Sequence, residues 1–148
     1  MNQELSTIGW REWIQLPELG LPWIKAKIDT GARTSCLHAF NVEPFTKDGK
    51  DWVRFGIHPH QEDTETEIYC EAEVHDSRIV TDSGGHKEKR YVILTTIALA
   101  NKSWPIEITL TNRDSMLFRF LLGRTAMKQK IIVNPGKSFL LGELKNEL

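Results

Sequence analysis

The chain has 148 residues, of which 40% are hydrophobic and 26% are charged, and its formal net charge is -1. This length suits one domain with its own hydrophobic core. The balanced charge argues against a protein that holds nucleic acid by neutralising phosphates, because such proteins carry a strong basic excess. The first residues show no secretory signal, and no apolar run is long enough to span a bilayer, so we expect a cytoplasmic protein that has neither nucleic acid nor a membrane as a partner.

Most of the chain is predicted to form β-strands. In the first predicted strand, "LPWIKAKID", Ile24, Ala26 and Ile28 alternate with two lysines, which places apolar side chains on one face and ammonium groups on the other. Further segments rich in β-branched or aromatic residues follow at 36–45, 51–59, 66–74, 90–99, 104–112 and 118–123. One short helix is predicted at 124–130, directly after Gly123. The sequence therefore predicts an all-β fold in one domain over residues 1–148.

Turn-forming residues separate several of these segments. The polar stretch "TDSGGHKEK" at 81–89 contains Gly84 and Gly85, which can both take positive φ, and it predicts a hairpin between "SRIV" and "RYVIL". Its long polar tip is typical of a mobile flap. "ANKS" at 100–103 and "PFTKDGKDW" at 44–52 predict two further turns.

The tetrapeptide Asp29-Thr30-Gly31-Ala32 directly follows the first predicted strand. These residue types are common in tight turns, because Asp and Thr side chains bond nearby backbone groups and Gly relieves φ. The alternative is a catalytic role for the carboxylate. The downstream sequence "FLLGRTAM" at 120–127 favours that alternative, because it supplies a second motif at a distance.

Together the two motifs resemble those of the single-lobed aspartic proteases of retroviral type. Residues 28–32 and 121–124 match that pattern, which is an apolar residue before Asp-Thr-Gly-Ala and two apolar residues before Gly-Arg. The longer stretches "PELGLPWIKAKIDTGARTSCLHAF", "WPIEITLTNRD" and "FLLGRTAM" resemble a prokaryotic branch of retropepsin-like proteins that is catalogued as ATP-dependent zinc proteases. The resemblance covers about residues 10–142. It implies a single-lobed acid protease barrel with one short helix after the Leu-Leu-Gly-Arg element.

The resemblance implies an aspartic peptidase that works as a homodimer. Two carboxylates share one proton in such enzymes, so that one activates water while the other protonates the carbonyl oxygen of the peptide. This chain has one Asp-Thr-Gly, so the second carboxylate must come from a second copy across a C2 axis. Asp29 would be catalytic, Thr30 would bond across the dimer, Gly31 would offer its N–H to the acid pair and Ala32 would keep the turn small.

The chain departs from the retroviral pattern after this turn. The next residue is usually acidic and pairs with the arginine of Gly-Arg, but here it is Arg33, so the usual pair with Arg124 cannot form. Asp114 is a candidate counter-ion. We expect a basic cleft that includes Arg33, Arg124 and Arg113, and Lys25 or Lys27 is expected on its rim unless these lysines belong to a solvated strand face.

Such a cleft suits an acidic substrate. Guanidinium groups pair bidentately with carboxylates, so clustered arginines favour Glu-rich peptides. The association of the resembled family with ATP-grasp enzymes that add glutamate to protein tails points to poly-glutamate segments. The glycines of the predicted flap, Gly84 and Gly85, are expected to close over the bound peptide.

No metal or cofactor is predicted. The sequence has no HExxH and no Walker A motif, and Cys36 and Cys70 form no CxxC pair and are expected to be free thiols. His58 and His60 lie on a polar loop with Glu62, Asp63 and Cys70 as loose candidates for a third ligand. Two alternative functions stay open, a catalytically weak peptide-binding module of the same fold and a metal-dependent hydrolase that uses the His58/His60 loop.

Overall fold

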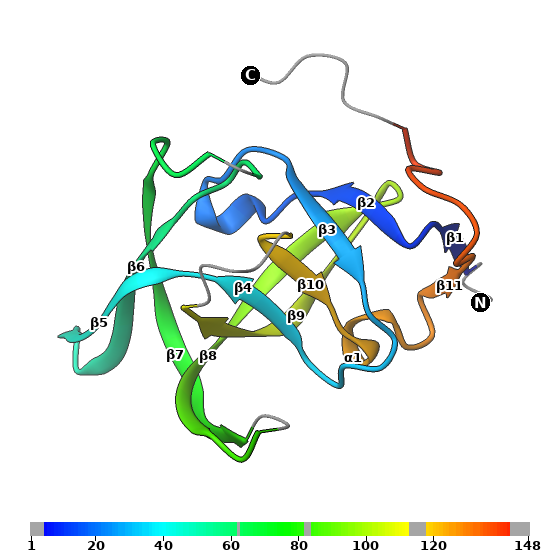
Figure 1. The fold of residues 1–148 in the computed structure, drawn as a ribbon. Helices are drawn as coiled ribbons and strands as arrows, with labels where there is room; N and C mark the ends of the chain where they lie inside the picture. The colour runs from blue at the N-terminus through cyan, green and yellow to red at the C-terminus, as the bar shows by residue number, and fades with distance from the viewer. Residues whose placement is uncertain (1–4, 62, 82–83, 113–117, 143–148) are drawn as a thin grey trace.

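The computed structural model describes residues 5–61, 63–81, 84–112 and 118–142. Strands dominate this part of the chain, which confirms the predicted all-β class (Figure 1). The elements in chain order are β1 (Ser6–Ile8), β2 (Arg11–Ile14), a 3₁₀-helix (Pro17–Leu19), β3 (Ile24–Ile28), β4 (Ser35–His38), β5 (Phe40–Lys47), β6 (Lys50–Ile57), β7 (Ile68–Thr81), β8 (Lys87–Leu99), β9 (Lys102–Thr111), β10 (Phe120–Leu122), α1 (Arg124–Met127) and β11 (Ile131–Val133). Neither helix in the described ranges is long and apolar enough to cross a bilayer.

Nine strands form one curved sheet in the order β2-β3-β10-β4-β9-β8-β7-β6-β5. Strands β2 and β5 are the two edges of this sheet, so hydrogen bonds do not close it into a complete barrel. Strands β1 and β11 form a separate parallel pair, in which Ser6 lies opposite Ile131. Figure 1 shows this pair beside α1, at the end of the molecule where the loop after β3 also lies.

The inner face of the curved sheet carries the hydrophobic core. The period of two in β3 is confirmed, because Ile24, Ala26 and Ile28 are buried while Lys27 is exposed. The largest fully buried side chains come from eight of the strands and, for Leu16, from the segment after β2, and they are Phe55, Phe120, Ile8, Ile14, Leu16, Ile24, Leu37, Ile57, Ile93, Ile97, Ile108 and Leu122. The alternation read from the sequence therefore does set the face of β3 that is buried.

Several strand boundaries differ from the prediction. The segment 36–45 is two strands, because the chain leaves β4 at Ala39 and Asn41 takes a φ of 50°. The segments predicted separately at 66–74 and 77–80 are one long strand, β7, with a register shift between Val74 and Asp76. Strands β1, β2 and β11 were not predicted, since three or four residues are too few to show a period.

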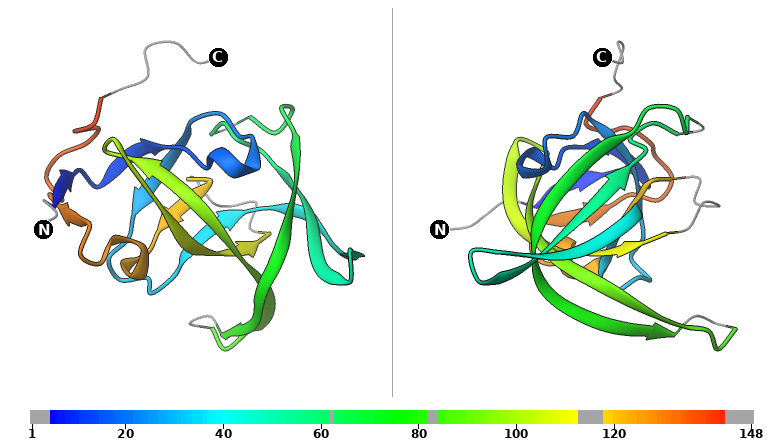
Figure 2. Two further views of the ribbon diagram at one scale, coloured as in Figure 1. Left: turned by 180° about the vertical axis from the view of Figure 1, so that it is seen from behind. Right: turned by 90° about the vertical axis from the view of Figure 1, so that its left-hand side faces the viewer.

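The three predicted turns are present. Asp48 and Gly49 join β5 to β6 and have φ values of 52° and 76°, while Ala100 and Asn101 join β8 to β9 with 56° and 59°. Positive φ at both central residues is the feature that lets a two-residue turn match the twist of the two strands. The third turn joins β7 to β8, and Figure 2 shows this hairpin extending beyond the rest of the sheet.

Candidate active site

The two motifs of the sequence meet because β10 lies between β3 and β4. Strand β10 runs parallel to β3, with Leu122 opposite Ile28, and antiparallel to β4, with Phe120 opposite Leu37. The loop 29–34 joins the two flanking strands, so it has to pass around the end of β10. This loop is called the acid loop below. Figure 1 shows it next to α1, which follows β10 directly.

Main-chain hydrogen bonds fix the acid loop to the Leu-Leu-Gly-Arg segment. The Asp29 N–H donates to the Leu122 carbonyl at 2.9 Å. In the other direction, the Arg124 N–H donates to the Ala32 carbonyl at 2.7 Å, and the Thr125 N–H donates to the Arg33 carbonyl at 3.0 Å. These bonds bring together the motifs at 28–32 and 121–124, which lie about ninety residues apart in the sequence.

Ser35 and Gly123 complete this junction. The Gly123 N–H donates to the Ser35 Oγ at 3.0 Å, and both residues are buried. A Cβ atom at Gly123 would lie 2.5 Å from the Thr34 carbonyl carbon, so only glycine allows the backbones to approach this closely. Ser35 is not predicted as a site residue, because a single serine carries no pattern that predicts a partner so far away in the chain.

The Asp29 carboxylate is held by its own loop. Its Oδ1 accepts the Gly31 N–H at 3.0 Å and the Ala32 N–H at 3.2 Å. Its Oδ2 accepts no hydrogen bond from any residue whose position is described. The side chain is half-buried. One oxygen is therefore oriented by main-chain donors, while the other can meet a second carboxylate or a water molecule.

A cavity of about 320 Å³ lies between the acid loop and the β7–β8 hairpin. It is called the flap cavity below, and it is lined by Ala32, Arg33, Thr34, Cys36, Arg78, Val80, Arg90, Thr109, Thr111 and Leu121. The hairpin residues that line this cavity, Arg78, Val80 and Arg90, lie just before and just after the predicted flap at 81–89. Gly84 and Gly85 lie farther out, in the exposed turn, where Gly85 has a φ of +85°.

The first arginine that the hairpin contributes to the flap cavity, Arg78, already has acidic partners. Its Nε donates to Asp76 Oδ2 at 2.9 Å, and one Nη donates to both Glu107 oxygens at 3.1 and 3.2 Å. The hydrogen bond with Asp76, followed by the one with Glu107, raises the pKa of Arg78. Conversely, the Arg78 hydrogen bond and then the Ser77 N–H lower the pKa of Asp76.

The other two arginines of the flap cavity differ from each other. Arg90 Nε donates to Glu88 Oε2 at 3.3 Å, and Glu88 also accepts the Thr111 hydroxyl at 3.2 Å. Arg33 is exposed and makes no ion pair within the described part of the chain. The charge of Arg33 is therefore the one in this cavity that no carboxylate of the described residues compensates.

A second cavity, of about 650 Å³, lies on the other side of the acid loop. It is called the helix cavity below, and it is lined by Thr30, Arg33, Arg124, Thr125, Met127, Lys128, Gln129, Ile131 and Val133. Arg124 Nη1 donates to the Thr30 carbonyl at 3.1 Å, so a main-chain oxygen takes the place of the acidic partner that the retroviral pattern would supply. Arg33 lines both cavities.

The remaining residues of the expected basic cleft fall elsewhere. Arg113 and Asp114 lie outside the described residues. The Lys25 ammonium lies 5.2 Å from the centroid of the Trp13 ring and 5.8 Å from that of Phe139, and neither Lys25 nor Lys27 lines a cavity beside the acid loop. The basic side chains found there instead are those of Arg78, Arg90 and Lys128, none of which was predicted.

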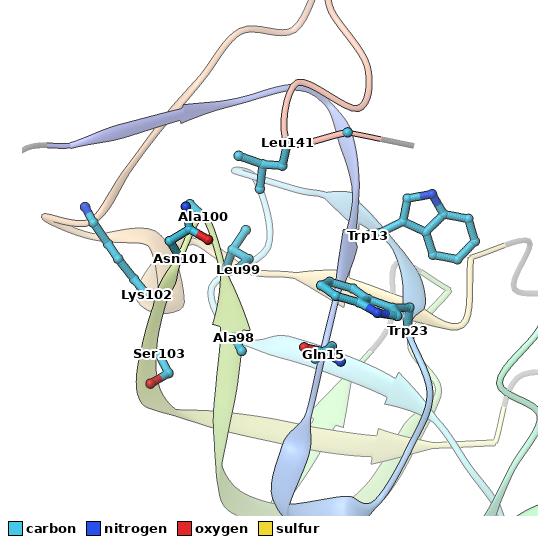
Figure 3. Close-up of a pocket in the computed structure, with 11 residues that line it drawn as sticks. Trp13, Gln15, Trp23, Ala98, Leu99, Ala100, Asn101, Lys102, Ser103 and Leu141 are labelled. Carbon is cyan, nitrogen blue, oxygen red and sulfur yellow. The ribbon is translucent and has the colours of Figure 1, made fainter. Parts of the chain in front are cut away.

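A third cavity, of about 530 Å³, lies at the far end of β3 (Figure 3). Trp13 and Trp23 line one part of it, and the β8–β9 turn with Leu141 lines another. Trp23 directly precedes β3, whereas Asp29 directly follows it, and a strand of five residues spans about 16 Å. This cavity is therefore too distant to take part in chemistry at the carboxylate.

The described residues around His58 show no arrangement suited to a metal, and Glu62, one of the candidate ligands, lies outside them. The His58 ring stacks on Phe40 with 4.4 Å between centroids, and its Nδ1 lies 3.3 Å from the Thr66 carbonyl oxygen. The Cys70 thiol is buried and donates to the Leu19 carbonyl. Within the described ranges, no group of three His, Cys, Asp or Glu side chains is gathered as metal ligands would be, so the metal-dependent alternative gains no support.

Comparison with known proteins agrees with this geometry. Residues 7–143 match the model of a family described as retropepsin-like aspartic endopeptidase RimB. Curated relatives named probable alpha-L-glutamate ligase, from Shewanella pealeana and Desulfotalea psychrophila, are 49% and 46% identical over 97% and 99% of this chain. The chain spans only 31% and 32% of the length of those two proteins.

A solved structure shares the fold. The crystal structure of Lpg0085, a protein of unknown function from Legionella pneumophila, superposes with a TM-score of 0.77 at 30% identity, covering 93% of this chain and 98% of that one. The family match spans nearly the whole chain and includes both motifs that meet at Asp29. The chain belongs to the RimB-like family of retropepsin-like aspartic endopeptidases.

Proposed function

We propose that this protein is an aspartic-type peptidase in which Asp29 of two copies forms one catalytic pair, and that it cleaves acidic peptide segments. One observation carries the proposal. The acid loop is fixed to the Leu-Leu-Gly-Arg segment by main-chain bonds from both sides, and it presents Asp29 half-buried with Oδ2 open. A carboxylate oriented in this way, beside a cavity of peptide side-chain size, suits general acid–base chemistry.

The chemistry requires two carboxylates that hold one proton between them. Because like charges at short distance cannot both ionise, one Asp29 would be neutral and the other ionised, as is known for aspartic proteases. The ionised carboxylate would take a proton from water as the water oxygen attacks the peptide carbonyl. The neutral one would give its proton to the carbonyl oxygen, and the tetrahedral intermediate would then release the amine after proton transfer to nitrogen.

The cationic side chains around the acid loop support an acidic substrate. Arg33 borders both cavities and has no acidic partner in the described ranges, while Arg78 and Arg90 line the wall opposite. Arginine pairs well with carboxylates because its planar fork matches both oxygens. The relatives named as glutamate ligases are about three times as long as this chain, so we assign to the matching third a peptidase role on glutamate-rich chains.

Asp29→Asn tests the catalytic part of the proposal. We expect the variant to keep the fold, because Asn can still accept the Gly31 and Ala32 N–H groups, and to lose at least ~10³-fold in the rate of cleaving a glutamate-rich peptide. The matched control is Asp51→Asn, which changes an exposed acid on β6. Cleavage products are measured by mass spectrometry, with a glutamine-rich peptide of equal length as the substrate control.

Four outcomes decide between the alternatives. Equal cleavage by Asp29→Asn and by the wild-type protein would exclude the acid pair, and loss of activity on chelation would favour the metal-dependent hydrolase. Tight binding of the glutamate-rich peptide without turnover by the wild-type protein would favour a peptide-binding module. No preference for the glutamate-rich over the glutamine-rich peptide would remove the proposed substrate class and leave the peptidase proposal standing.

A further inference from the structure

The helix cavity has an uncompensated positive charge. Three of its lining side chains are cationic, Arg33, Arg124 and Lys128, and none of the described residues that line it is acidic. Arg33 and Lys128 make no ion pair with any residue in the described ranges, and Arg124 donates to a carbonyl oxygen. The flap cavity differs in this respect, because two of its three arginines are paired with carboxylates of the same chain.

The rest of the lining suits a peptide. Thr30, Thr125 and Gln129 supply polar groups, and Met127, Ile131 and Val133 supply apolar surface. A cavity of about 650 Å³ is large enough for several side chains, and a lining that combines cations with apolar surface fits an aliphatic side chain that ends in a carboxylate. Glutamate has this shape. Arg33 joins the helix cavity to the flap cavity, so one acidic chain could reach both.

The position of this charge bears on how two copies meet. Thr30 follows Asp29 directly, and Arg124 is bonded to the Thr30 carbonyl, so the cationic group lies beside the acid that must face its counterpart at the axis. Pairing of two copies would bring these three cationic side chains of each copy close to those of the other. Like charges that approach within about a Debye length (~8–10 Å at 0.1–0.15 M salt) repel each other, and an anion placed between them removes this repulsion.

We propose that the helix cavity is a binding site for the carboxylates of an acidic peptide, and that its occupation drives the pairing of two copies. This inference rests on the proposed function, because it takes the Asp29 pair as the meeting point. A ligand that binds the paired state more tightly than the single chain shifts the equilibrium toward the pair. The acidic substrate would thus assemble the enzyme that cleaves it, and the unpaired protein would be inactive.

The test uses the full chain with Asp29→Asn, which prevents turnover. Sedimentation velocity at 50 mM NaCl gives the dimer dissociation constant alone and with hexaglutamate, hexaglutamine or inorganic phosphate. We expect hexaglutamate to lower this constant at least about tenfold and hexaglutamine to leave it unchanged. In the same background, Lys128→Gln should have a lower dimer dissociation constant without peptide. The factor by which hexaglutamate lowers that constant should be at least about threefold smaller than in the parent. Lys50→Gln, an exposed lysine in the β5–β6 hairpin, should behave as the parent does.

The results that overturn the inference are distinct from those that overturn the proposed function. A tight dimer whose dissociation constant is unchanged by hexaglutamate would refute anion-driven pairing and would agree with the proposed function. An equal response in Lys128→Gln and Lys50→Gln would refute the assignment of the site. If phosphate, added at the same total negative charge as hexaglutamate, lowers the dimer dissociation constant equally, the site is not specific to an acidic peptide. A single chain under all these conditions would refute both proposals.

Discussion

Replacing Ser35 by alanine tests whether the junction below the acid loop depends on one hydroxyl group. The Ser35 side chain is fully buried, and its Oγ accepts the Gly123 N–H at 3.0 Å. Alanine occupies nearly the same volume, so the change removes the acceptor without adding steric strain. The Gly123 N–H then stays buried without an acceptor, because the alanine methyl group cannot accept a hydrogen bond and the site is closed to solvent.

The size of the effect follows from that lost acceptor. Leaving one buried donor unsatisfied costs about 1–3 kcal/mol, so we expect the free energy of unfolding to fall by about 2 kcal/mol. For a domain of this size each kcal/mol corresponds to about 2–4 °C, which gives a decrease in Tm of about 4–8 °C. Activity should fall as well, because Gly123 directly follows Leu122, whose carbonyl accepts the Asp29 N–H.

Urea unfolding followed by circular dichroism measures this change. The control is Ser103→Ala, which removes an exposed hydroxyl in β9 and should change the free energy of unfolding by less than about 0.5 kcal/mol. The reasoning is refuted if the Ser35 and Ser103 variants unfold at the same urea concentration with equal slopes. It is also refuted if peptidase activity is fully retained while stability falls, since the hydroxyl would then have no influence on Asp29.

Two further predictions concern buried groups away from the acid loop. Glu12 is fully buried, and its carboxylate accepts the N–H groups of Gly9, Leu140 and Leu141 at 2.7, 2.8 and 3.2 Å. Glu12→Gln replaces one acceptor oxygen by a donor, so it should lower the free energy of unfolding in urea by about 1.5–3 kcal/mol and raise amide hydrogen exchange at 140–141. Unchanged exchange at these two amides would contradict this. Burial raises the pKa of Cys70 from 9.0 to about 11, so as the pH rises the thiol ionises in the unfolded chain before it ionises in the folded one. The contribution of the neutral Cys70 thiol to the free energy of unfolding is therefore complete below pH 9 and is lost as the pH rises toward 11. Stability should therefore fall more steeply between these values in the wild-type protein than in Cys70→Ala, and parallel pH profiles would contradict this.

The meeting of the two motifs could be predicted from sequence because both carry short, specific patterns. Asp-Thr-Gly-Ala after an alternating strand predicted the acid loop, and the structure places Leu122 and Arg124 within hydrogen-bonding distance of it. The short strands could not be predicted, since β1 and β11 have three residues each and hold together by pairing across more than a hundred positions. A local pattern contains no information about such a distant partner.

The charged groups around the acid were harder to predict than the acid itself. Lys25 and Lys27 lie near Asp29 in sequence, yet the Lys25 ammonium lies over the rings of Trp13 and Phe139, and neither lysine lines a cavity beside the acid loop. Arg78 and Arg90 come from the long hairpin, whose register decides which of its side chains face the acid loop. A shift by one residue would turn both arginines to the opposite face of the hairpin.

The way the acid loop is held explains how its surroundings can differ from the retroviral pattern while Asp29 keeps its position. Apart from the bond that the Arg124 side chain donates to the Thr30 carbonyl, the hydrogen bonds that fix the loop to β10 and α1 in the described part of the chain use main-chain groups or the Ser35 hydroxyl, and none is an ion pair. The Arg124 side chain donates to the Thr30 carbonyl, so an acidic residue at position 33 is not needed to hold Arg124 in place. Position 33 is then free to carry a cation beside Asp29. In the proposed peptidase, the charge preference for the substrate can therefore change at position 33 while the backbone keeps the Asp29 carboxylate in place.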